Sequence, residues 1–264
     1  MVKNDGVTKQ YTDDSNLNMR QYLHQNFSIN KLGWTKWVYQ NYEFKSNAKV
    51  LELGCGNGMI WKDNLELIPD DIDITLTDFS EGMLATAKSN LTALHNINYR
   101  VVNIEEINFP DQTFDVVIAN HMLYHVPDRD KALHEVRRVL KLGGTFYATT
   151  MGNRNMAEYR ELLMDFDGRI NYSDVGMSKR FGLENGKEQI IKYFSDVTRR
   201  DYEDGLKITN VEALYNYTIS LEGIYNVADI VRDRKEQFID YLNDKMRLEG
   251  AIYISKLAGI FIAK

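Results

Sequence analysis

The segment Val50–Gly58 constrains the fold of this chain more than any other feature. It reads Val-Leu-Glu-Leu-Gly-Cys-Gly-Asn-Gly, so an apolar run with one acid leads directly into three glycines at alternate positions. Such a run is typical of a buried strand, and the glycines predict a turn at which the backbone passes close to a ligand. Dinucleotide-binding turns usually follow G-x-G-x-x-G, whereas this turn follows acid-x-G-x-G-x-G. The spacing therefore favours an adenosine-bearing cofactor other than a nicotinamide dinucleotide.

Short apolar runs alternate with helical patterns between Ala48 and Thr150. Five of these runs predict strands, at 49–53, 73–77, 99–102, 114–119 and 145–149. Helices are predicted between them, at 59–67, 80–94 and 130–140. Ser80 suits the N-cap of the second helix, and Leu142 to Gly144 predict the turn into the fifth strand. Strands that alternate with helices in this way predict an α/β fold with a parallel sheet and helices on both faces.

The flanking segments predict helical additions around this sheet. Helical spacing covers three of them, 16–41, 153–193 and 210–248, and the first has an excess of aromatic side chains. Two further strands are predicted, at 196–202 and 257–263. We therefore expect an N-terminal helical cap over residues 1–45 and a sheet domain over residues 46–264. Helical insertions into that domain are expected at about 153–193 and 210–248.

Composition limits the class of protein and its partners. The 264 residues carry a formal net charge of −6 and show no dense run of Lys or Arg, so we expect no nucleic-acid partner. The single cysteine, Cys55, excludes an internal disulfide and a cysteine-based metal cluster, and we expect no metal. Residues 1–15 lack the apolar core of a signal peptide, and no segment approaches the ~20 apolar residues that span a bilayer. We therefore expect a cytoplasmic protein without a membrane span.

Polar residues follow the first four predicted strands. Glu52 precedes the glycine turn, where a carboxylate attracts an ammonium group or orders water. Asp78 ends the second strand, where an acid accepts hydrogen bonds from both hydroxyls of a ribose. Residues 103–105 offer an amide and backbone groups to the edge of adenine, and Asn120 and His121 begin the loop after the fourth strand. Ligands bind outside the carboxyl ends of such strands, so one site is predicted there.

These residues resemble the class I S-adenosylmethionine-dependent methyltransferases, in the small-molecule branch that includes the ubiquinone and menaquinone biosynthesis enzymes. The match runs in order over Val50–Thr149, in the pieces LELGCGNG at 51–58, LTDFSEGML at 76–84, NIE at 103–105 before Phe109-Pro110, FDVV at 114–117 and LKLGG at 140–144. Asn103 stands where many relatives have Asp, and Leu142 where many have Pro. The resemblance implies a Rossmann-like, seven-stranded, mostly parallel sheet with an antiparallel last strand.

The resemblance also implies the cofactor, S-adenosyl-L-methionine, and its product, S-adenosyl-L-homocysteine. Gly54, Gly56 and Gly58 would face the methionine part of the cofactor, Asp78 would bind the ribose, and Asn120 would lie near the sulfonium. The expected cofactor-binding residues are Glu52, Gly54, Cys55, Gly56, Asn57, Gly58, Asp78, Phe79, Ser80, Met83, Asn103, Ile104, Glu105, Asn120 and His121.

Methyl transfer from this cofactor is an in-line displacement, so the protein mainly aligns the nucleophile and excludes water. A base is needed only where the nucleophile arrives protonated. His121, Tyr124 and His125 are the candidate catalytic residues, either as positioning groups or as a base. His125 has the alternative of holding its own loop through the backbone, and Tyr124 fits a wall of the site better than a base.

The N-terminal helical segment is expected to close over the cofactor, as the resemblance implies. Its candidate substrate-lid residues are Arg20, His24 and Trp34. Arg20 and His24 either reach the site or are solvated. Trp34 and Trp37, three residues apart on one helix, have the simpler interpretation of packing the cap on the sheet. The aromatic content of the lid favours an apolar or cyclic methyl acceptor.

The sequence thus predicts a methyltransferase that acts on a small organic molecule. A non-catalytic protein that senses S-adenosylmethionine is an alternative, because the displacement needs no signature catalytic residue. An NAD- or FAD-dependent oxidoreductase shares the glycine turn and the ribose acid, but the glycine spacing disfavours it. A nucleic-acid or protein methyltransferase is disfavoured by the acidic charge and by the lack of an Asn-Pro-Pro-Tyr signature.

Overall fold

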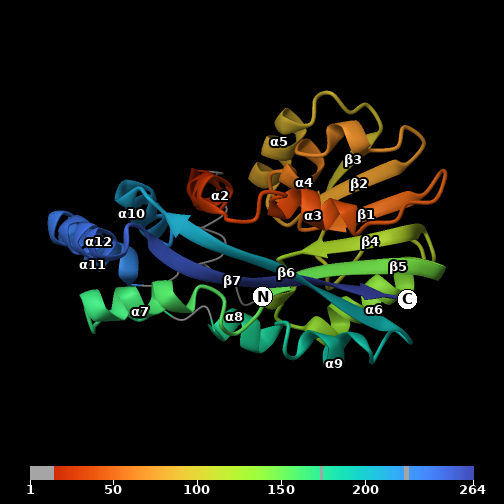
Figure 1. Ribbon diagram of the computed structural model, residues 1–264. Coiled ribbons are helices and arrows are strands. Elements are labelled where there is room, and N and C mark those ends of the chain that lie inside the picture. The colour runs from red at the N-terminus through yellow and green to blue at the C-terminus, as the bar shows by residue number, and fades with distance from the viewer. Residues whose placement is uncertain (1–14, 173–174, 223–225) are drawn as a thin grey trace. The chain divides into compact units, whose positions relative to one another are not determined.

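The computed structural model describes residues 15–172, 175–222 and 226–264, coloured along the chain in Figure 1. The chain forms two compact units. The first, which we call the sheet unit, consists of Trp34–Asn153, Gly176–Tyr202 and Ala258–Lys264. The second, which we call the helical unit, consists of Met1–Gly33, Arg154–Val175 and Glu203–Leu257.

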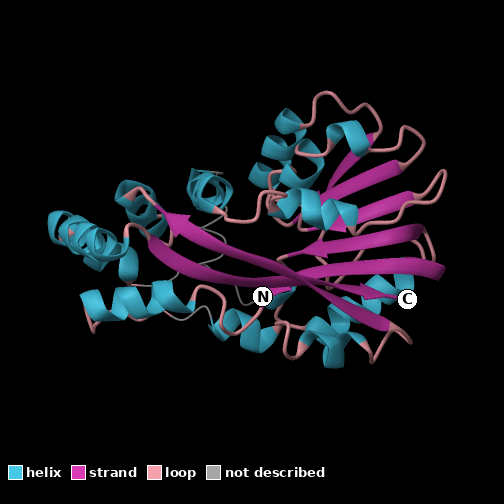
Figure 2. Cartoon of the chain, viewed as in Figure 1, coloured by secondary structure: helices cyan, strands magenta, loops and turns pink. Residues whose placement is uncertain are grey.

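Seven strands form one sheet in the order β3-β2-β1-β4-β5-β7-β6 (magenta in Figure 2). Their bounds are β1 Lys49–Leu53, β2 Asp73–Asp78, β3 Ile97–Val101, β4 Phe114–Asn120, β5 Leu140–Met151, β6 Val197–Ile208 and β7 Ile252–Ala263. Strands β1 to β5 pair in parallel with their neighbours, and β7 pairs antiparallel with β5. The expected Rossmann-like sheet, mostly parallel with an antiparallel last strand, is confirmed.

Successive side chains of the central strands are buried on both faces of this sheet. Val50 and Leu51 of β1 are both fully buried, as are Val117 and Ile118 of β4. Because neighbouring residues of a strand point to opposite faces, both faces must be covered. The helices of the sheet unit are α3 Trp34–Gln40, α4 Met59–Lys62, α5 Glu81–Asn90, α6 Arg129–Val139, most of α8 Val175–Arg180, and α9 Gly186–Ile190, with 3-10 turns η1 Leu65–Leu67 and η2 Leu123–His125.

Helices α3 and α4 share one core with the sheet. Val38 of α3 and Trp61 of α4 are fully buried in the cluster that contains Val50, Val116 and Ile260. Helix α6 has a narrow apolar stripe, in which Ala132, Leu133, Val136 and Val139 are buried. Such a stripe at helical spacing is what a helix needs to pack on a sheet.

Several element boundaries differ from the sequence prediction. The predicted helix 59–67 is broken into α4 and η1, and α5 ends at Asn90 rather than near residue 94. The predicted turn at 142–144 lies inside β5, where Gly143 has a φ of +72° and the pairing with β4 shifts register. Strand β6 continues to Ile208, beyond the predicted end at residue 202. Its continuation includes the charged residues Glu203 and Asp204, which hide it from an apolar-run criterion.

The helical unit has its own core. Its helices are α2 Ser15–Phe27, α7 Ala157–Phe166, α10 Val211–Ile219, α11 Val227–Asp233 and α12 Lys235–Glu249. Leu23, Tyr159, Leu214 and Phe238 are fully buried together in this core. The two helices of the predicted N-terminal cap thus pack in different cores, α2 here and α3 in the sheet unit. The predicted domain division stays a prediction.

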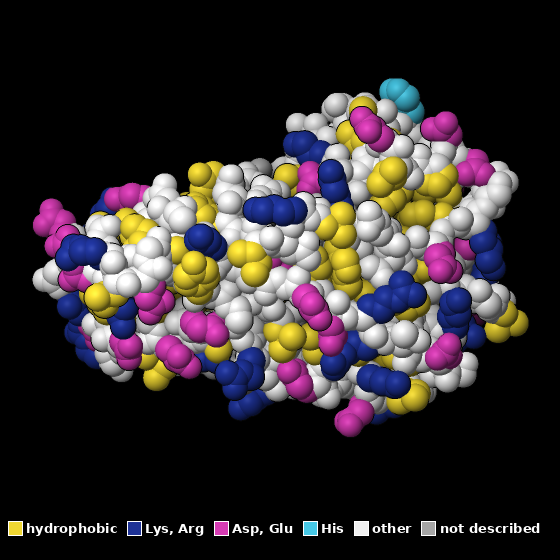
Figure 3. Space-filling view, in the orientation of Figure 1, with side chains coloured by type: hydrophobic (Ala, Val, Ile, Leu, Met, Phe, Trp, Pro, Cys, Tyr) yellow, Lys and Arg dark blue, Asp and Glu magenta, His cyan; other side chains and the backbone are white. Residues whose placement is uncertain are grey.

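The visible surface has mixed charge. Lys and Arg side chains are interspersed with those of Asp and Glu over the residues drawn in colour in Figure 3. Within the described ranges, no helix has both the length and the apolar character needed to cross a membrane.

Candidate functional site

The turn after β1 needs glycine for both conformation and space. Gly54, Gly56 and Gly58 have φ values of +70°, +56° and +74°, in the left-handed region that other residues rarely adopt. A Cβ on Gly54 would lie 3.1 Å from the Met122 side chain, and one on Gly58 would lie 2.9 Å from Leu91. The three glycines therefore allow a tight loop that other residues at positions 54 and 58 would strain and crowd.

Asp78 lies beside this loop because β2 pairs in parallel with β1, with Leu53 opposite Thr77. Its carboxylate accepts hydrogen bonds from the backbone N–H of Gly56 at 2.9 Å and of Ser80 at 2.8 Å. Burial raises the pKa of the Asp78 carboxyl, and these backbone donors oppose the rise. A carboxylate has about four acceptor positions, so acceptor capacity remains for a hydroxyl donor of a ligand.

The residues after Asp78 lead into α5. Ser80 Oγ accepts a hydrogen bond from the Met83 N–H at 3.3 Å, which confirms the predicted N-cap. The Phe79 side chain is 73% exposed next to Asp78, whereas Met83 is buried. The structure therefore presents an open aromatic side chain beside the acid and keeps Met83 in the core.

The loop after β3 is held to α6 by hydrogen bonds. Asn103 Oδ1 accepts from the Glu105 N–H at 3.0 Å, and Glu105 Oε1 accepts from the Asp128 N–H at 2.8 Å. Farther along, Arg138 of α6 donates to the carbonyl oxygens of residues 107 and 109 at 2.6 and 2.8 Å. Ile104, in the same loop, is buried. Arg138 was not predicted, because its role depends on a loop distant in sequence.

Glu52 is buried, and both of its oxygens are bound by protein donors. Trp61 Nε1 donates to Oε2 at 2.5 Å, and Asn120 Nδ2 donates to Oε1 at 2.8 Å. Burial raises the pKa of the Glu52 carboxyl, although these two donors favour its charged form. The acid expected to attract an ammonium group or water is thus engaged with side chains of α4 and β4.

Asn120 connects Glu52 to two residues that the sequence did not reveal. The Tyr42 hydroxyl lies 2.8 Å from Asn120 Nδ2 and 3.1 Å from Oδ1, and Thr149 Oγ1 donates to Oδ1 at 3.2 Å. Tyr42 lies just beyond the predicted helical segment 16–41, and no pattern in the sequence singled it out. No spacing in the chain relates residues 42, 61, 120 and 149, so only the folded sheet brings them together.

His121 begins the loop after β4 in a strained conformation. Its φ is +48°, and its N–H lies 3.1 Å from both the carbonyl oxygen and Oγ1 of Thr149. Its ring centroid lies 5.0 Å from that of Trp34, which in turn lies 5.3 Å from that of Tyr202. Trp34 also stacks on Trp37 at 5.5 Å. We call Trp34, Trp37, His121 and Tyr202 the aromatic cluster.

Tyr124 and His125 follow in η2. Tyr124 is buried, and its ring lies 4.6 Å from that of His125 and 6.3 Å from that of His121. The three candidate catalytic side chains are therefore neighbours. Their catalytic roles stay predictions, as do the cofactor contacts expected for Asn57 and the other loop residues.

Arg20 and His24 lie on α2 of the helical unit, whereas the other candidate residues lie in the sheet unit. The His24 ring packs edge-on against Tyr217 at 5.7 Å. The part of these two residues in a substrate lid stays a prediction.

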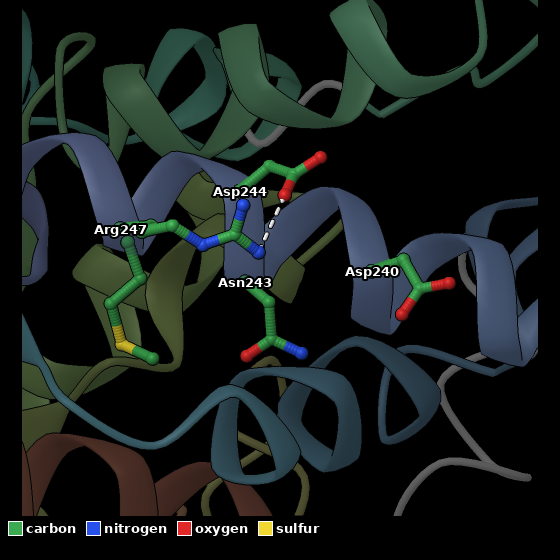
Figure 4. A pocket seen from close by; sticks show the side chains of 5 residues that line it. Asp240, Asn243, Asp244 and Arg247 are labelled. Atoms are coloured by element: carbon green, nitrogen blue, oxygen red, sulfur yellow. Dashed lines mark ion pairs between the residues drawn. The ribbon is translucent and has the colours of Figure 1, made fainter.

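The surface of α12 carries a hollow of about 620 Å³ that is unrelated to these loops. It is lined by Asp240, Asn243, Asp244, Met246 and Arg247 (Figure 4). Arg247 is paired with Asp244 at 2.9 Å. Its lining contains none of the candidate residues, and we assign no role to it.

Residues 51–148 match the family model described as a methyltransferase domain. Malonyl-[acyl-carrier protein] O-methyltransferase 1 of Ilyobacter polytropus is 31% identical over 129 residues, which cover 49% of this chain and 47% of that protein. The ubiquinone/menaquinone biosynthesis C-methyltransferase UbiE of Pasteurella multocida is 35% identical over 121 residues, 45% of each chain. The matches thus span less than half the length of these relatives.

Two solved structures share the fold over most of this chain. Phosphoethanolamine N-methyltransferase 2 of Haemonchus contortus, in complex with S-adenosyl-L-methionine, gives a TM-score of 0.59 at 18% identity and covers 98% of this chain and 59% of its own. The YcgJ protein of Bacillus subtilis gives 0.55 at 18% identity and covers 86% and 96%. Residues 51–148 are thus similar to methyltransferase domains, and this segment includes the glycine loop, Asp78 and Asn120.

Proposed function

We propose that the protein transfers a methyl group from S-adenosylmethionine to a small organic molecule. The observation that carries this proposal is the glycine loop after β1 with the Asp78 carboxylate hydrogen-bonded to its Gly56 N–H. A loop with three left-handed glycines beside a partly exposed acid suits the methionine and ribose parts of that cofactor.

The neighbouring side chains fit the adenosine end of such a ligand. Asp78 would accept from the ribose hydroxyls, and the exposed Phe79 and Val101 offer an apolar surface for the adenine ring. Val101 is the register partner of Asp78 on β3, so this surface adjoins the acid. Residues 103–105 would supply the groups that meet the adenine edge.

The loop after β4 would face the acceptor. When bound, S-adenosylmethionine supplies a methyl group activated by a positive sulfur. The chain's own residues then have to align the acceptor and exclude water. The aromatic cluster around His121 supports an acceptor with an apolar or cyclic part, and His121 would position it or hold the proton that it loses.

The names of the relatives support methyl transfer without identifying the acceptor. One is named for O-methylation of a malonyl group on a carrier protein and the other for C-methylation in quinone biosynthesis. The two names differ in the methylated atom, so they do not predict which atom of the acceptor this chain methylates. A cytoplasmic location forms part of the proposal.

Calorimetric titration with S-adenosylmethionine, S-adenosylhomocysteine and NAD tests the cofactor. We expect the first two to bind and NAD to give no heat of binding. Transfer of a labelled methyl group to a panel of small metabolites then tests the activity. Cofactor binding without transfer to any of them would favour the sensor alternative, and binding of NAD alone would overturn the proposal.

A further inference from the structure

A buried polar network lies between the ends of β1 and β4. It consists of Tyr42, Glu52, Trp61, Asn120 and Thr149, which come from five separate segments of the sheet unit. We call it the Glu52 network. Glu52 and Thr149 are 2% and 0% exposed, and Trp61 is fully buried. The described hydrogen bonds join all five side chains through Glu52 and Asn120.

Such a network is costly unless it is satisfied. The carboxylate of Glu52 is held by an indole N–H and an amide N–H, which are neutral donors, and not by a cation. Buried polar groups that lose one partner cost the full desolvation penalty of the group left behind. An apolar core of similar volume is often as stable as a buried charged network. The network's position therefore calls for an explanation beyond stability.

That position is next to two loops of the candidate site. Glu52 lies two residues before Gly54, the first left-handed glycine, and Asn120 immediately precedes His121, whose φ is +48°. Thr149 holds the start of the loop after β4. Its hydroxyl oxygen accepts a hydrogen bond from the His121 N–H and donates one to Asn120 Oδ1. A shift of Glu52 or Asn120 would thus move the start of each loop.

We propose that Tyr42 and Trp61 are positioning residues for the cofactor: they hold Asn120 and Glu52, and through them fix the glycine loop and the loop of His121. This inference rests on the proposed function. Tyr42 contacts Asn120 directly, and Trp61 contacts Glu52 directly, so each acts on a different loop.

The first experiment compares Tyr42→Phe with Tyr39→Phe. Tyr39 is a matched control, because it is also buried in the same core and its hydroxyl donates to the Leu67 carbonyl at 3.0 Å, outside the network. We expect Tyr42→Phe to weaken S-adenosylmethionine binding about fivefold, the equivalent of one hydrogen bond of about 1 kcal/mol. Tyr39→Phe should leave the affinity within about twofold, while both variants lose similar thermal stability.

The second experiment measures how the affinity depends on pH in Trp61→Phe. This variant keeps an aromatic ring but removes the donor that favours charged Glu52, so the pKa of the carboxyl should rise further. We expect the loss of affinity on acidification to begin at a higher pH than in the wild type. Asp78 on β2, Cys55 in the glycine loop and Tyr42 also face this region and are unchanged, so only the difference between the proteins is attributed to Glu52.

The outcomes separate this inference from the proposed function. A wild-type protein that does not bind S-adenosylmethionine would overturn both. If the wild type binds, equal affinities of the Tyr42→Phe and Tyr39→Phe variants, together with an unchanged pH profile for Trp61→Phe, would overturn the positioning role alone. Should Trp61→Phe fail to fold, the tyrosine pair decides the question, since each of those variants removes one hydroxyl group only.

Discussion

Two carboxylates lie near the ends of neighbouring parallel strands, and the fold uses them differently. Asp78 of β2 is partly exposed, and its carboxylate accepts hydrogen bonds from backbone N–H groups, including those of Gly56 and Ser80. Glu52 of β1 is 2% exposed, and both of its oxygens are bound by side chains. The comparison teaches that an acid near a glycine loop has two possible tasks, to meet the ligand or to hold the loop.

Glu52→Ala should have the largest effect on stability. It leaves the Trp61 indole N–H without its acceptor and opens a cavity, for a loss of about 2 kcal/mol of unfolding free energy. Urea unfolding measures this, with the exposed Glu66→Ala in η1 as the control that should change little. An unfolding free energy unchanged in Glu52→Ala would contradict the comparison, because the buried carboxylate would then hold no partner in place.

Asp78→Ala should act on binding. We expect the affinity for S-adenosylmethionine to fall at least tenfold, or about 1.4 kcal/mol, because the ribose acceptor is lost and the Gly56 N–H is released. Calorimetry measures this against Asp71→Ala, two residues before the start of the same strand, which should bind as the wild type does. An unchanged affinity in Asp78→Ala would remove this acid from the ribose site.

Ser80→Ala distinguishes the effect of the helix cap from the effect of the neighbouring Asp78. The variant loses the hydroxyl that caps α5, at a cost of about 1 kcal/mol, but keeps the backbone N–H that Asp78 binds. Thermal unfolding should therefore show a loss of stability, and calorimetry then tests whether the predicted cofactor contact of Ser80 uses its hydroxyl, with a fall in affinity, or its backbone alone. The control is Thr86→Ala on the same helix, whose hydroxyl donates back to the Gly82 carbonyl. An unchanged affinity would restrict the Ser80 side chain to capping the helix.

Glu52→Gln should give the smallest change, in the pH dependence of stability. Because burial raises the folded-state pKa of this carboxyl, the folded protein retains the proton longer than the unfolded chain. Stability attributable to Glu52 is therefore greatest below the ordinary pKa of 4.5 and falls as pH rises toward the folded-state value. In Glu52→Gln the unfolding free energy should fall less steeply with rising pH. The remaining fall comes from Asp78, whose pKa is also raised in the folded protein. Equal slopes in urea unfolding series would contradict the expectation.

The sequence predicted those parts of the site whose residues are contiguous in the chain. The glycine spacing and the strand that ends in Asp78 are contiguous patterns, so the loop, the parallel sheet and the family all followed from them. Tyr42 and Trp61 have no such pattern, because only strand pairing brings them to Glu52 and Asn120. Likewise, the charged Glu203 and Asp204 concealed the second half of β6, where pairing with a neighbouring strand decides the conformation.

The single cysteine lies between these two acids in the glycine loop. Burial and the negative charges of Glu52 and Asp78 all raise the pKa of the Cys55 thiol well above its ordinary value. Only a thiolate is a strong nucleophile, and S-adenosylmethionine is an alkylating agent. The same two carboxylates that differ in their structural tasks thus cooperate in keeping the sulfur of Cys55 protonated. In the proposed site, Cys55 is therefore a weak nucleophile toward the cofactor that its own loop would bind.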